Sequence, residues 1–394
     1  MGGYAPPPER HPRSRMQSPG PDASRAAHFP PIPGLRRVLI CGPVAEVGQP
    51  ARGGFQSANL RVMDVLRRLG AEVDALRYPD RDGNLLTKIL VYTFVFLRIA
   101  AAIMFGNPRG CAIHFTPYAK QFMLGECALI LIARLRGYRV VIDLRAGSKQ
   151  EIYNTSGPLH RATFRMALRS AHAVSFEGRA YDAFVAEVAP EKPRFYLPNF
   201  IAAEELRQRQ SFDPEGPTLV YVGIVSEDKG ALATIALARR LRDRLPGARL
   251  TFIGRLHRAI EPQLRALGGS EPWIEFTGAL PPDQMRARLD EAHFFVFLTL
   301  WRGEGHSNAL TEAMGRGCVP IVTRHGFLPD VVGPHGFILD DREQTEAAVS
   351  WMAACWNETD WMSASRAVVD RVAQNFVDLG IDGILHDIYS AAFA

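Results

Sequence analysis

The stretch HFFVFLTLWRGEGHSNALTEAMGRGCVPIVT, residues 293–323, decides the fold that we expect for this chain. Its two apolar runs, at 293–300 and 319–323, are typical of buried strands. Between them, residues 301–306 predict a loop. The good helix caps Ser307 and Asn308, the helix formers after them and the glycines at 315 and 317 then predict a helix. A strand, a helix and a second strand in this order predict parallel strands joined by a crossover helix.

The same alternation of apolar runs and helical patterns continues on both sides of this stretch. Further candidate strands lie at 37–41, 72–76, 111–115, 138–143, 173–176 and 194–198, and then at 218–223, 248–254 and 273–278. Between the two sets, Leu197-Pro-Asn-Phe200 and the polar residues 204–216 interrupt the pattern. Strands that alternate with helices indicate parallel sheets, so we expect an α/β fold of two doubly wound, Rossmann-like domains joined near residue 200.

The domains are expected to have the following bounds. Residues 1–33 are rich in proline and have no long apolar segment, which predicts a disordered tail and not a signal peptide. The first Rossmann-like domain spans 34–198 and the second spans 199–375. The last segment, 376–394, has apolar residues at helical spacing and predicts a helix that packs against either half. One option is that this helix returns to the first domain.

The net charge and the cysteines indicate which partners the protein can bind and in which cellular compartment it is expected. The formal net charge of +5 favours anionic partners such as phosphates, nucleotides or an acidic membrane surface. The five cysteines are scattered without a C-x-x-C pair, so we expect no zinc site, no disulfide framework and a reducing, cytoplasmic location. No basic run with interleaved aromatic residues supports nucleic-acid binding.

One long apolar run, from Ile89 to Phe105, is interrupted by Arg98. It is too short for a membrane-spanning helix, so a helix buried inside the first domain is the favoured interpretation. The alternative is a helix whose face rests on a bilayer, helped by Lys88 and Arg98. That alternative predicts a peripheral location at the inner face of the plasma membrane.

The loop after the strand at 293–300 is the first candidate for a ligand site. Ligands of open α/β sheets bind beyond the carboxyl ends of the strands, where this loop is expected to lie. Glu304 lies in the loop, Glu312 lies inside the following helix, and Gly305 lets the backbone approach a ligand closely. The start of the helix offers N–H groups to a phosphate, and a carboxylate at Glu312 suits the hydroxyls of a ribose. Taken alone, an ordinary surface helix with two solvated glutamates explains the pattern equally well.

Two further stretches point to the same chemistry. The strand at 218–223 runs into Gly223 and then Lys229, whose cation can neutralise a diphosphate. After the first strand, Gly53 and Gly54 begin a helix whose backbone N–H groups are expected to face the cleft between the domains. Paired glycines are common in turns, so this last signal is weak on its own.

Together, these stretches resemble the retaining glycosyltransferases of family 4, whose GT-B fold places two Rossmann-like domains across a cleft. The most specific part is the family's Glu-x7-Glu motif, which runs here from Glu304 to Glu312 and continues to Pro320. Three further motifs match in order and spacing: Gly53-Gly54, Leu197-Pro-Asn199 and Gly223 to Lys229-Gly230. The resemblance covers about residues 36–394.

The resemblance implies roles for individual residues. The first domain would face the acceptor, and the second would bind a UDP- or GDP-linked sugar. Glu312 would hold the ribose of this donor, Glu304 would lie near the sugar and Lys229 would hold the pyrophosphate. The remaining donor-binding residues would be Gly53, Gly54, Gly223, Gly305, His306, Ser307, Asn308, Ala309 and Leu310. Members of the family transfer the sugar with retention of configuration and need neither a divalent metal nor a cofactor.

The sequence departs from the family at two positions. Many relatives have an arginine after the glycine that ends the strand at 218–223, where this chain has Ile224; Arg302 and Arg255 are the candidates to replace its charge. Relatives also often have a histidine after the strand near residue 143, where Arg145 stands here and would contact the substrate. His114 is a candidate acceptor contact, and a buried core histidine is the equal alternative.

We therefore expect a retaining, metal-independent hexosyltransferase that acts on a nucleotide-sugar and a glycan or glycolipid acceptor. The assembly of capsule, exopolysaccharide or lipopolysaccharide is the expected pathway class. Glu304, Lys229, Arg302, Arg145 and His114 are the candidate catalytic residues. Ile224 and the missing histidine leave a second class open, a GT-B-fold scaffold that binds a partner without catalysis.

Overall fold

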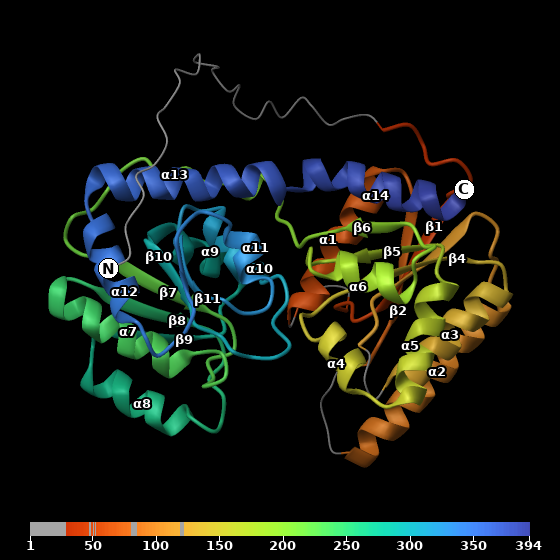
Figure 1. Ribbon diagram of the computed structural model, residues 1–394, viewed down its shortest axis with the longest axis horizontal. Coiled ribbons are helices and arrows are strands. Elements are labelled where there is room, and N and C mark those ends of the chain that lie inside the picture. The colour runs from red at the N-terminus through yellow and green to blue at the C-terminus, as the bar shows by residue number, and fades with distance from the viewer. Residues whose placement is uncertain (1–28, 47–48, 50, 52, 80–84, 119–121) are drawn as a thin grey trace, which may run out of the picture.

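The computed structural model describes residues 29–394 except 47–48, 50, 52, 80–84 and 119–121, and it contains two six-stranded sheets (Figure 1). All neighbouring strands in both sheets are parallel. The expected α/β class with two doubly wound sheets is confirmed. Most of the expected proline-rich tail, residues 1–28, lies outside the described residues.

The first sheet has the order β2-β1-β3-β4-β5-β6. Its strands are β1 (Arg37–Gly42), β2 (Glu72–Arg77), β3 (Cys111–Phe115), β4 (Arg139–Leu144), β5 (Ala173–Phe176) and β6 (Arg194–Tyr196). One face is covered by α2 (Leu85–Phe105), α3 (Met123–Leu135), α4 (Lys149–Thr155), α5 (Pro158–Ser170) and α6 (Tyr181–Val188). The other face is covered by α1 (Gly54–Arg68) and α14 (Asp378–Phe393). We call these elements the first lobe.

The second sheet has the order β12-β11-β10-β7-β8-β9. Its strands are β7 (Thr218–Val222), β8 (Arg249–Ile253), β9 (Ile274–Gly278), β10 (Phe294–Phe297), β11 (Val319–Thr323) and β12 (Phe337–Leu339). Its helices are α7 (Ala231–Arg244), α8 (Glu261–Ser270), α9 (Pro282–Glu291), α10 (Asn308–Met314), α11 (Leu328–Val332), α12 (Glu346–Cys355) and α13 (Glu358–Asn375). We call these elements the second lobe.

The strands of the first sheet contribute side chains to two separate cores. Successive residues of a strand point to opposite faces, so Val140 and Ile142 of β4 pack with α2, α3 and α5, while Val141 packs with α1 and α14. A parallel sheet that is buried on both faces requires nearly continuous apolar strands. This explains why β3, β5 and β11 have the bounds that the apolar runs predicted.

Helix α14 follows the second lobe in the chain but packs against the first. In Figure 1, α13 and α14 run one after the other along the same side of both lobes. Ile381, Leu385 and Ile388 of α14 are buried in the core under α1. A parallel bridge between Ile201 and Val377 joins the two crossing segments. The domain bounds at residues 198 and 375 stay predictions.

The apolar run at 89–105 forms a helix, α2, but only one of its faces is buried. Tyr92, Ile99 and Ile103 lie in the interior, whereas Phe94 and Leu97 are exposed. The interpretation as a buried helix is therefore wrong for the outer face. Within the described residues, the structure has no helix that is long and apolar enough to span a bilayer.

Strand β10 ends at Phe297, three residues earlier than the apolar run predicted. The chain turns away from the sheet there, because the N–H of Leu300 donates to the carbonyl of Asp228, at 2.8 Å, in the loop after β7. The apolar residues Leu298 and Leu300 thus already belong to the loop at the carboxyl edge of the sheet. Strand β12 was not predicted, since it has only three residues.

Candidate functional site

The strand order of the second sheet reverses between β7 and β10, at the position where doubly wound sheets form a ligand crevice. Strands β7 and β10 are neighbours, but the chain continues from β7 to one side of the sheet and from β10 to the other. Ligands of doubly wound sheets bind at the carboxyl ends of two such strands. Lys229 follows β7 and Glu304 follows β10, so the fold brings together two residues that are distant in the sequence.

Lys229 and Glu304 form an ion pair with 3.2 Å between Nζ and Oε2, and their side chains are 17% and 8% exposed. The ammonium also lies 4.4 Å from the centre of the Trp301 ring and 5.6 Å from that of Phe297. Aromatic faces attract a cation and hold it in place. Burial raises the pKa of Glu304, although the charge of Lys229 opposes this shift. The pair fixes a lysine cation at the crevice.

Helix α10 begins directly after this loop. Ser307 is its N-cap, and its Oγ accepts a hydrogen bond from the N–H of Leu310 at 3.4 Å. His306 is buried just before the helix, with Nε2 2.8 Å from Oγ1 of Thr311. Burial, together with the charge of Arg145, lowers the pKa of His306 to about 3. His306 is therefore neutral and supplies no charge to an anionic ligand.

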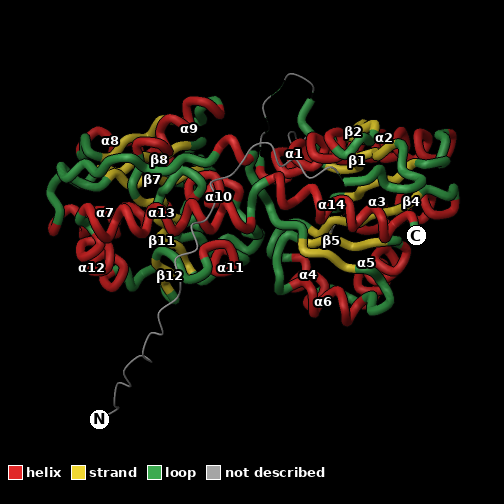
Figure 2. Tube along the Cα trace, turned by 90° about the horizontal axis from the view of Figure 1, so that it is seen from above, coloured by secondary structure: helices red, strands yellow, loops and turns green. Residues whose placement is uncertain are grey.

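Glu312 and Asn308 of α10 face the first lobe. Arg61 of α1 donates to Oε1 of Glu312 at 2.5 Å and to Oδ1 of Asn308 at 3.2 Å. Asn308 Nδ2 in turn donates to the carbonyl of Gly54, at 3.1 Å, at the start of α1. Figure 2 shows α1 and α10 next to each other where the two lobes meet. The predicted ribose ligand Glu312 thus lies at the contact between the lobes.

Glycines allow the lobes to approach each other around Glu304. A Cβ on Gly305 would overlap Oε1 of Glu177, which follows β5 of the first lobe. A Cβ on Gly147, in the loop after β4, would overlap the carbonyl oxygen of Glu304. Side chains at either position would hold the two backbones apart.

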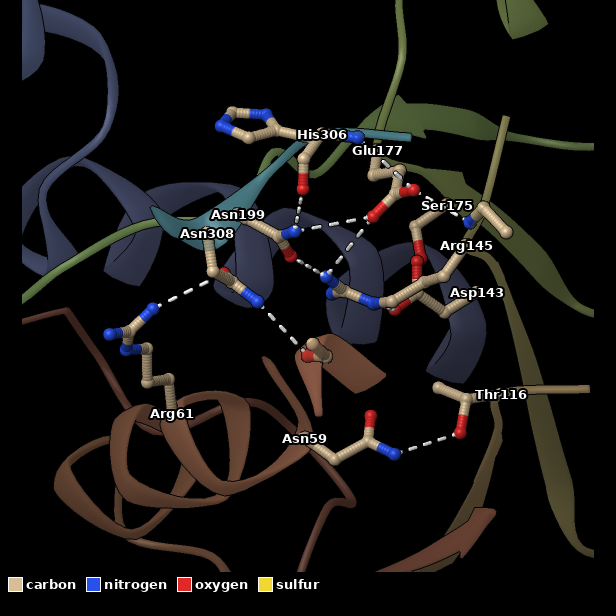
Figure 3. A network of polar contacts seen from close by, with 12 residues as sticks. Asn59, Arg61, Thr116, Asp143, Arg145, Ser175, Glu177, Asn199, His306 and Asn308 are labelled. Atoms are coloured by element: carbon tan, nitrogen blue, oxygen red, sulfur yellow. Dashed lines mark hydrogen bonds and ion pairs between the residues drawn. The ribbon is translucent and has the colours of Figure 1, made fainter. Parts of the chain in front are cut away.

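A buried polar network lies behind this contact (Figure 3). Glu177 accepts hydrogen bonds from the N–H of Ala146 at 2.6 Å and from the N–H of His306 at 3.4 Å. Asn199 donates to the carbonyl of His306 at 2.5 Å and accepts a hydrogen bond from Arg145. Burial raises the pKa of Glu177 to about 7, although the charge of Arg145 opposes this shift. The network connects side chains of the first lobe to the backbone of the loop before α10.

Two predicted catalytic residues, Arg145 and His114, lie inside the first lobe. Arg145 is buried, and its Nε donates to Oδ2 of Asp143 at 2.5 Å. His114 is buried as well, with Nδ1 3.0 Å from the hydroxyl of Tyr389. Burial pushes the pKa of Asp143 up, but Arg145 and His114 outweigh it and lower the pKa to about 2. Arg145 thus holds the side chain of Asn199. The burial of His114 agrees with the alternative that it is a histidine of the core.

One of the two arginines considered as replacements at Ile224 is engaged by the first lobe. Arg302 forms an ion pair with Glu151 of α4 in the first lobe. Arg255 is exposed after β8, and Ile224 is itself 42% exposed. Within the described residues, Glu304 pairs with Lys229 and with neither of these arginines. Arg61 is the arginine that the structure brings to Glu312.

The remaining predicted residues take these places. Gly53 is the N-cap of α1, and a Cβ on Gly54 would lie 3.3 Å from Nδ2 of Asn308. Gly223 has a φ of 144°, which favours glycine, and nothing lies within 4 Å of a Cβ there. The side chain of Leu310 is buried in the second core, so only its backbone and that of Ala309 are candidates for ligand contact.

The sequence analysis missed Arg61 and Glu177. A signal for Glu177 was present, because it directly follows the strand at 173–176 and thus lies at the same edge of the first sheet as Arg145, which directly follows β4. Arg61 carries no such signal, since it is one of many arginines on amphipathic helices. Within the described residues, no group of three or more His, Cys, Asp or Glu side chains is arranged to hold a metal ion.

A family model matches most of the second lobe. Residues 216–355 match the family model "Glycosyl transferases group 1". A segment of 192 residues is 31% identical to the GDP-mannose:cellobiosyl-diphosphopolyprenol alpha-mannosyltransferase of Xanthomonas oryzae pv. oryzae, covering 48% of this chain and 50% of that protein. The match therefore spans about half the length of this curated relative.

Solved structures resemble the whole chain in fold. Sucrose-phosphate synthase from Thermosynechococcus elongatus superposes with a TM-score of 0.69 at 16% identity, over 91% of this chain and 99% of that one. Anabaena HepE in complex with UDP and glucose superposes with a TM-score of 0.63 at 14% identity, over 90% of this chain and 100% of that one. Residues 216–355 thus match the family model of the group 1 glycosyl transferases, and the chain that contains them has the GT-B fold.

Proposed function

We propose that this protein is a glycosyltransferase that moves a sugar from a nucleoside-diphosphate-sugar to a hydroxyl group of an acceptor. The observation that carries the proposal is the Lys229–Glu304 pair, 3.2 Å apart at the crevice of the second sheet. Glu312 follows on the helix after the same loop. Membership of residues 216–355 in the group 1 family supports the proposal.

In this proposal, the donor lies across the loop before α10. Lys229 binds the diphosphate, Glu312 binds the ribose hydroxyls and Glu304 lies near the sugar. The backbone of Ser307 to Leu310 contacts the phosphates, and Gly53 and Gly54 approach the donor from the first lobe. Arg145 acts through Asn199 as a positioning residue, because it is buried behind the loop.

The proposed reaction retains the configuration of the sugar. The bond between the anomeric carbon and the diphosphate oxygen breaks, and a bond from the acceptor oxygen forms on the same face. The acceptor proton passes to an oxygen of the departing phosphate. Negative charge grows on the diphosphate as the bond breaks, so a lysine fixed beside it stabilises the transition state more than the ground state. We propose that no divalent metal takes part.

The donor base and the acceptor are narrower proposals. The names of both Xanthomonas relatives specify GDP-mannose as the donor and a diphosphopolyprenol-linked sugar as the acceptor. A GDP-linked hexose is therefore the first donor to test, ahead of UDP-linked sugars. We propose a glycan or glycolipid acceptor in the assembly of a surface polysaccharide, and a cytoplasmic position in contact with the inner face of the membrane.

The test combines ligand binding with product formation. Thermal unfolding is measured with GDP, UDP, ADP, TDP and CMP, and transfer from the matching sugars to lipid-linked acceptors is followed by mass spectrometry in the presence of EDTA. A ligand at a hundred times its Kd adds about 2.7 kcal/mol of stability. We expect one nucleoside diphosphate to raise Tm, and Lys229→Ala and Glu312→Ala to reduce that rise.

Matched controls separate the site from general effects of charge. Lys192→Ala removes a lysine from a loop of the first lobe, and Glu358→Gln neutralises an exposed glutamate of α13. Both controls should keep the full nucleotide response. If no nucleotide raises Tm of the parent protein, the loss of the arginine at position 224 has abolished donor binding, and the alternative of a GT-B-fold scaffold is favoured.

A further inference from the structure

The outer face of α2 is an apolar stripe that stays exposed in the described part of the chain. Its large exposed apolar residues are Ile89, Leu90, Val91, Phe94, Leu97, Met104 and Phe105, and four of them, Leu90, Phe94, Leu97 and Met104, recur at helical spacing. Phe94, Leu97 and Phe105 are 66%, 65% and 88% exposed. The opposite side of the same helix is held in the core by Tyr92, Ile99 and Ile103. A helix that is apolar all round is expected to be buried on both sides.

Two neighbouring helices also have exposed apolar side chains. Helix α2 packs on α3, and α3 packs on α5. Figure 1 shows the three helices together on the part of the first lobe that is remote from the second sheet. Large apolar side chains are also exposed on α3 and α5, at Leu124, Leu135, Leu159 and Met166. An apolar surface of this extent marks an interaction site.

The exposed charges with described side chains on α2, α3 and α5 are of one sign. The exposed ionisable residues with described side chains on the three helices are arginines: Arg98, Arg134, Arg161, Arg165 and Arg169. The carboxylate among these side chains, Glu126 of α3, is buried. Arg98 and Arg77 also line a hollow between β2 and α2, next to the stripe. Two guanidinium groups at the edge of an apolar surface suit an anionic phosphate group.

We propose that α2, α3 and α5 dock the first lobe onto a bilayer that contains anionic lipids. The apolar stripe enters the boundary between headgroups and acyl chains, and exposed arginines such as Arg98 and Arg161 pair with lipid phosphates. A second copy of the chain is a poorer occupant of this face, because two arginine-rimmed surfaces would repel each other. This inference deepens the proposed membrane contact by naming its surface and its lipid class, and it does not depend on catalysis.

The test is sedimentation of the full chain with vesicles, without any sugar donor. Vesicles of phosphatidylcholine alone are compared with vesicles that also contain phosphatidylglycerol, at low and high salt. We expect binding to the anionic vesicles that weakens with salt. Phe94→Ser combined with Leu97→Ser should lower binding about tenfold or more, since both side chains lose their apolar contact. Leu379→Ser, on exposed Leu379 of α14, is the matched control and should bind as the parent does.

The arginines are tested separately. Arg98→Gln combined with Arg161→Gln should weaken binding to anionic vesicles by about fivefold for each arginine, and should flatten the salt dependence. Arg98→Lys with Arg161→Lys should keep the binding, and Arg366→Gln, on exposed Arg366 of α13, is the control. All of these positions are exposed, so Tm and the nucleotide response should stay at the level of the parent.

Three outcomes overturn the proposal. Equal sedimentation of the parent and the Phe94→Ser/Leu97→Ser variant means that another surface holds the protein on vesicles. A dimer that forms without lipid and dissociates in the same variant means that a second copy covers the face. A parent protein that binds no vesicles also contradicts the membrane proposal. If its nucleotide response is normal, the proposed donor site is unaffected, so the two proposals fail independently.

Discussion

Arg61 of α1 and Glu312 of α10 form an ion pair across the two lobes, with 2.5 Å between Nη2 and Oε1. Glu312 is the residue proposed to bind the ribose of the donor, so its carboxylate is already occupied by the opposite lobe. The pair is partly shielded, with side chains that are 20% and 14% exposed. A nucleotide that binds Oε1 of Glu312 must therefore displace Arg61 or separate the lobes at this point.

The first prediction concerns this competition. Arg61→Ala frees Glu312, so we expect the nucleoside diphosphate to bind about fivefold more tightly, which corresponds to about 1 kcal/mol for a partly exposed pair. Isothermal titration of the parent and the variant measures the change. Arg67→Ala is the matched control, because Arg67 lies on the same helix and pairs with exposed Asp64. Weaker binding in Arg61→Ala would mean that Arg61 contacts the donor itself.

The second prediction concerns Lys229. Lys229→Ala removes the cation beside the proposed diphosphate and leaves Glu304 buried without its partner. We therefore expect the activation barrier to rise by about 2.7–4 kcal/mol, so that kcat falls 10²–10³-fold. KM should change much less, because the charge on the diphosphate grows mainly in the transition state. Initial rates over a range of donor concentrations separate kcat from KM. Lys192→Ala should keep both, and a loss confined to KM would argue against electrostatic stabilisation by Lys229.

The sheets could be predicted from the sequence because their order is encoded locally. Strands buried on both faces need continuous apolar runs, so β3, β5 and β11 were found with their correct bounds. The loop of Glu304 and the position of Lys229 follow from the same local patterns, since both come directly after a strand. The strand order then brings the two together without any further signal in the sequence.

The contacts between the lobes could not be predicted in this way. Arg61 meets Glu312 only because two separate sheets bring α1 and α10 into contact, and no pattern in α1 singles out one arginine. The outer face of α2 was misjudged for a related reason. An apolar helix in a sequence looks the same whether its second face meets protein or is left exposed.

The third prediction follows from the raised pKa of Glu177. Its pKa in the folded protein is about 7 instead of the ordinary 4.5, because the carboxyl is buried. The folded state thus binds the proton more tightly, and this group stabilises the fold below about pH 4.5 and loses that contribution as the pH rises to about 7. Glu177→Gln cannot ionise, so the stability of the parent relative to the variant should fall across this window.

The measurement is the difference in Tm between the parent and Glu177→Gln at several pH values from about 5 to 8. His306 contributes the opposite slope, since its pKa is lowered to about 3 by burial, but it is present in both proteins and cancels in the difference. Glu358→Gln, at an exposed glutamate, should give a difference that is independent of pH. A constant difference for Glu177→Gln as well would show that Glu177 stays ionised throughout the range.

The last prediction tests the close approach of the lobes at Gly305. A Cβ at this position would overlap Oε1 of Glu177, whose carboxylate is held in place by the N–H of Ala146 at 2.6 Å. We expect Gly305→Ala to cost about 1–3 kcal/mol, as overpacking does in a well-packed interior, and to reduce the Tm rise caused by the nucleotide. Gly157→Ala is the control, because nothing lies within 4 Å of a Cβ there and φ is −66°. Adding Glu177→Ala to Gly305→Ala removes the overlap, so the double variant should be more stable than the sum of the single changes predicts. Strict additivity would place the damage in the loop itself and not in its contact with the first lobe.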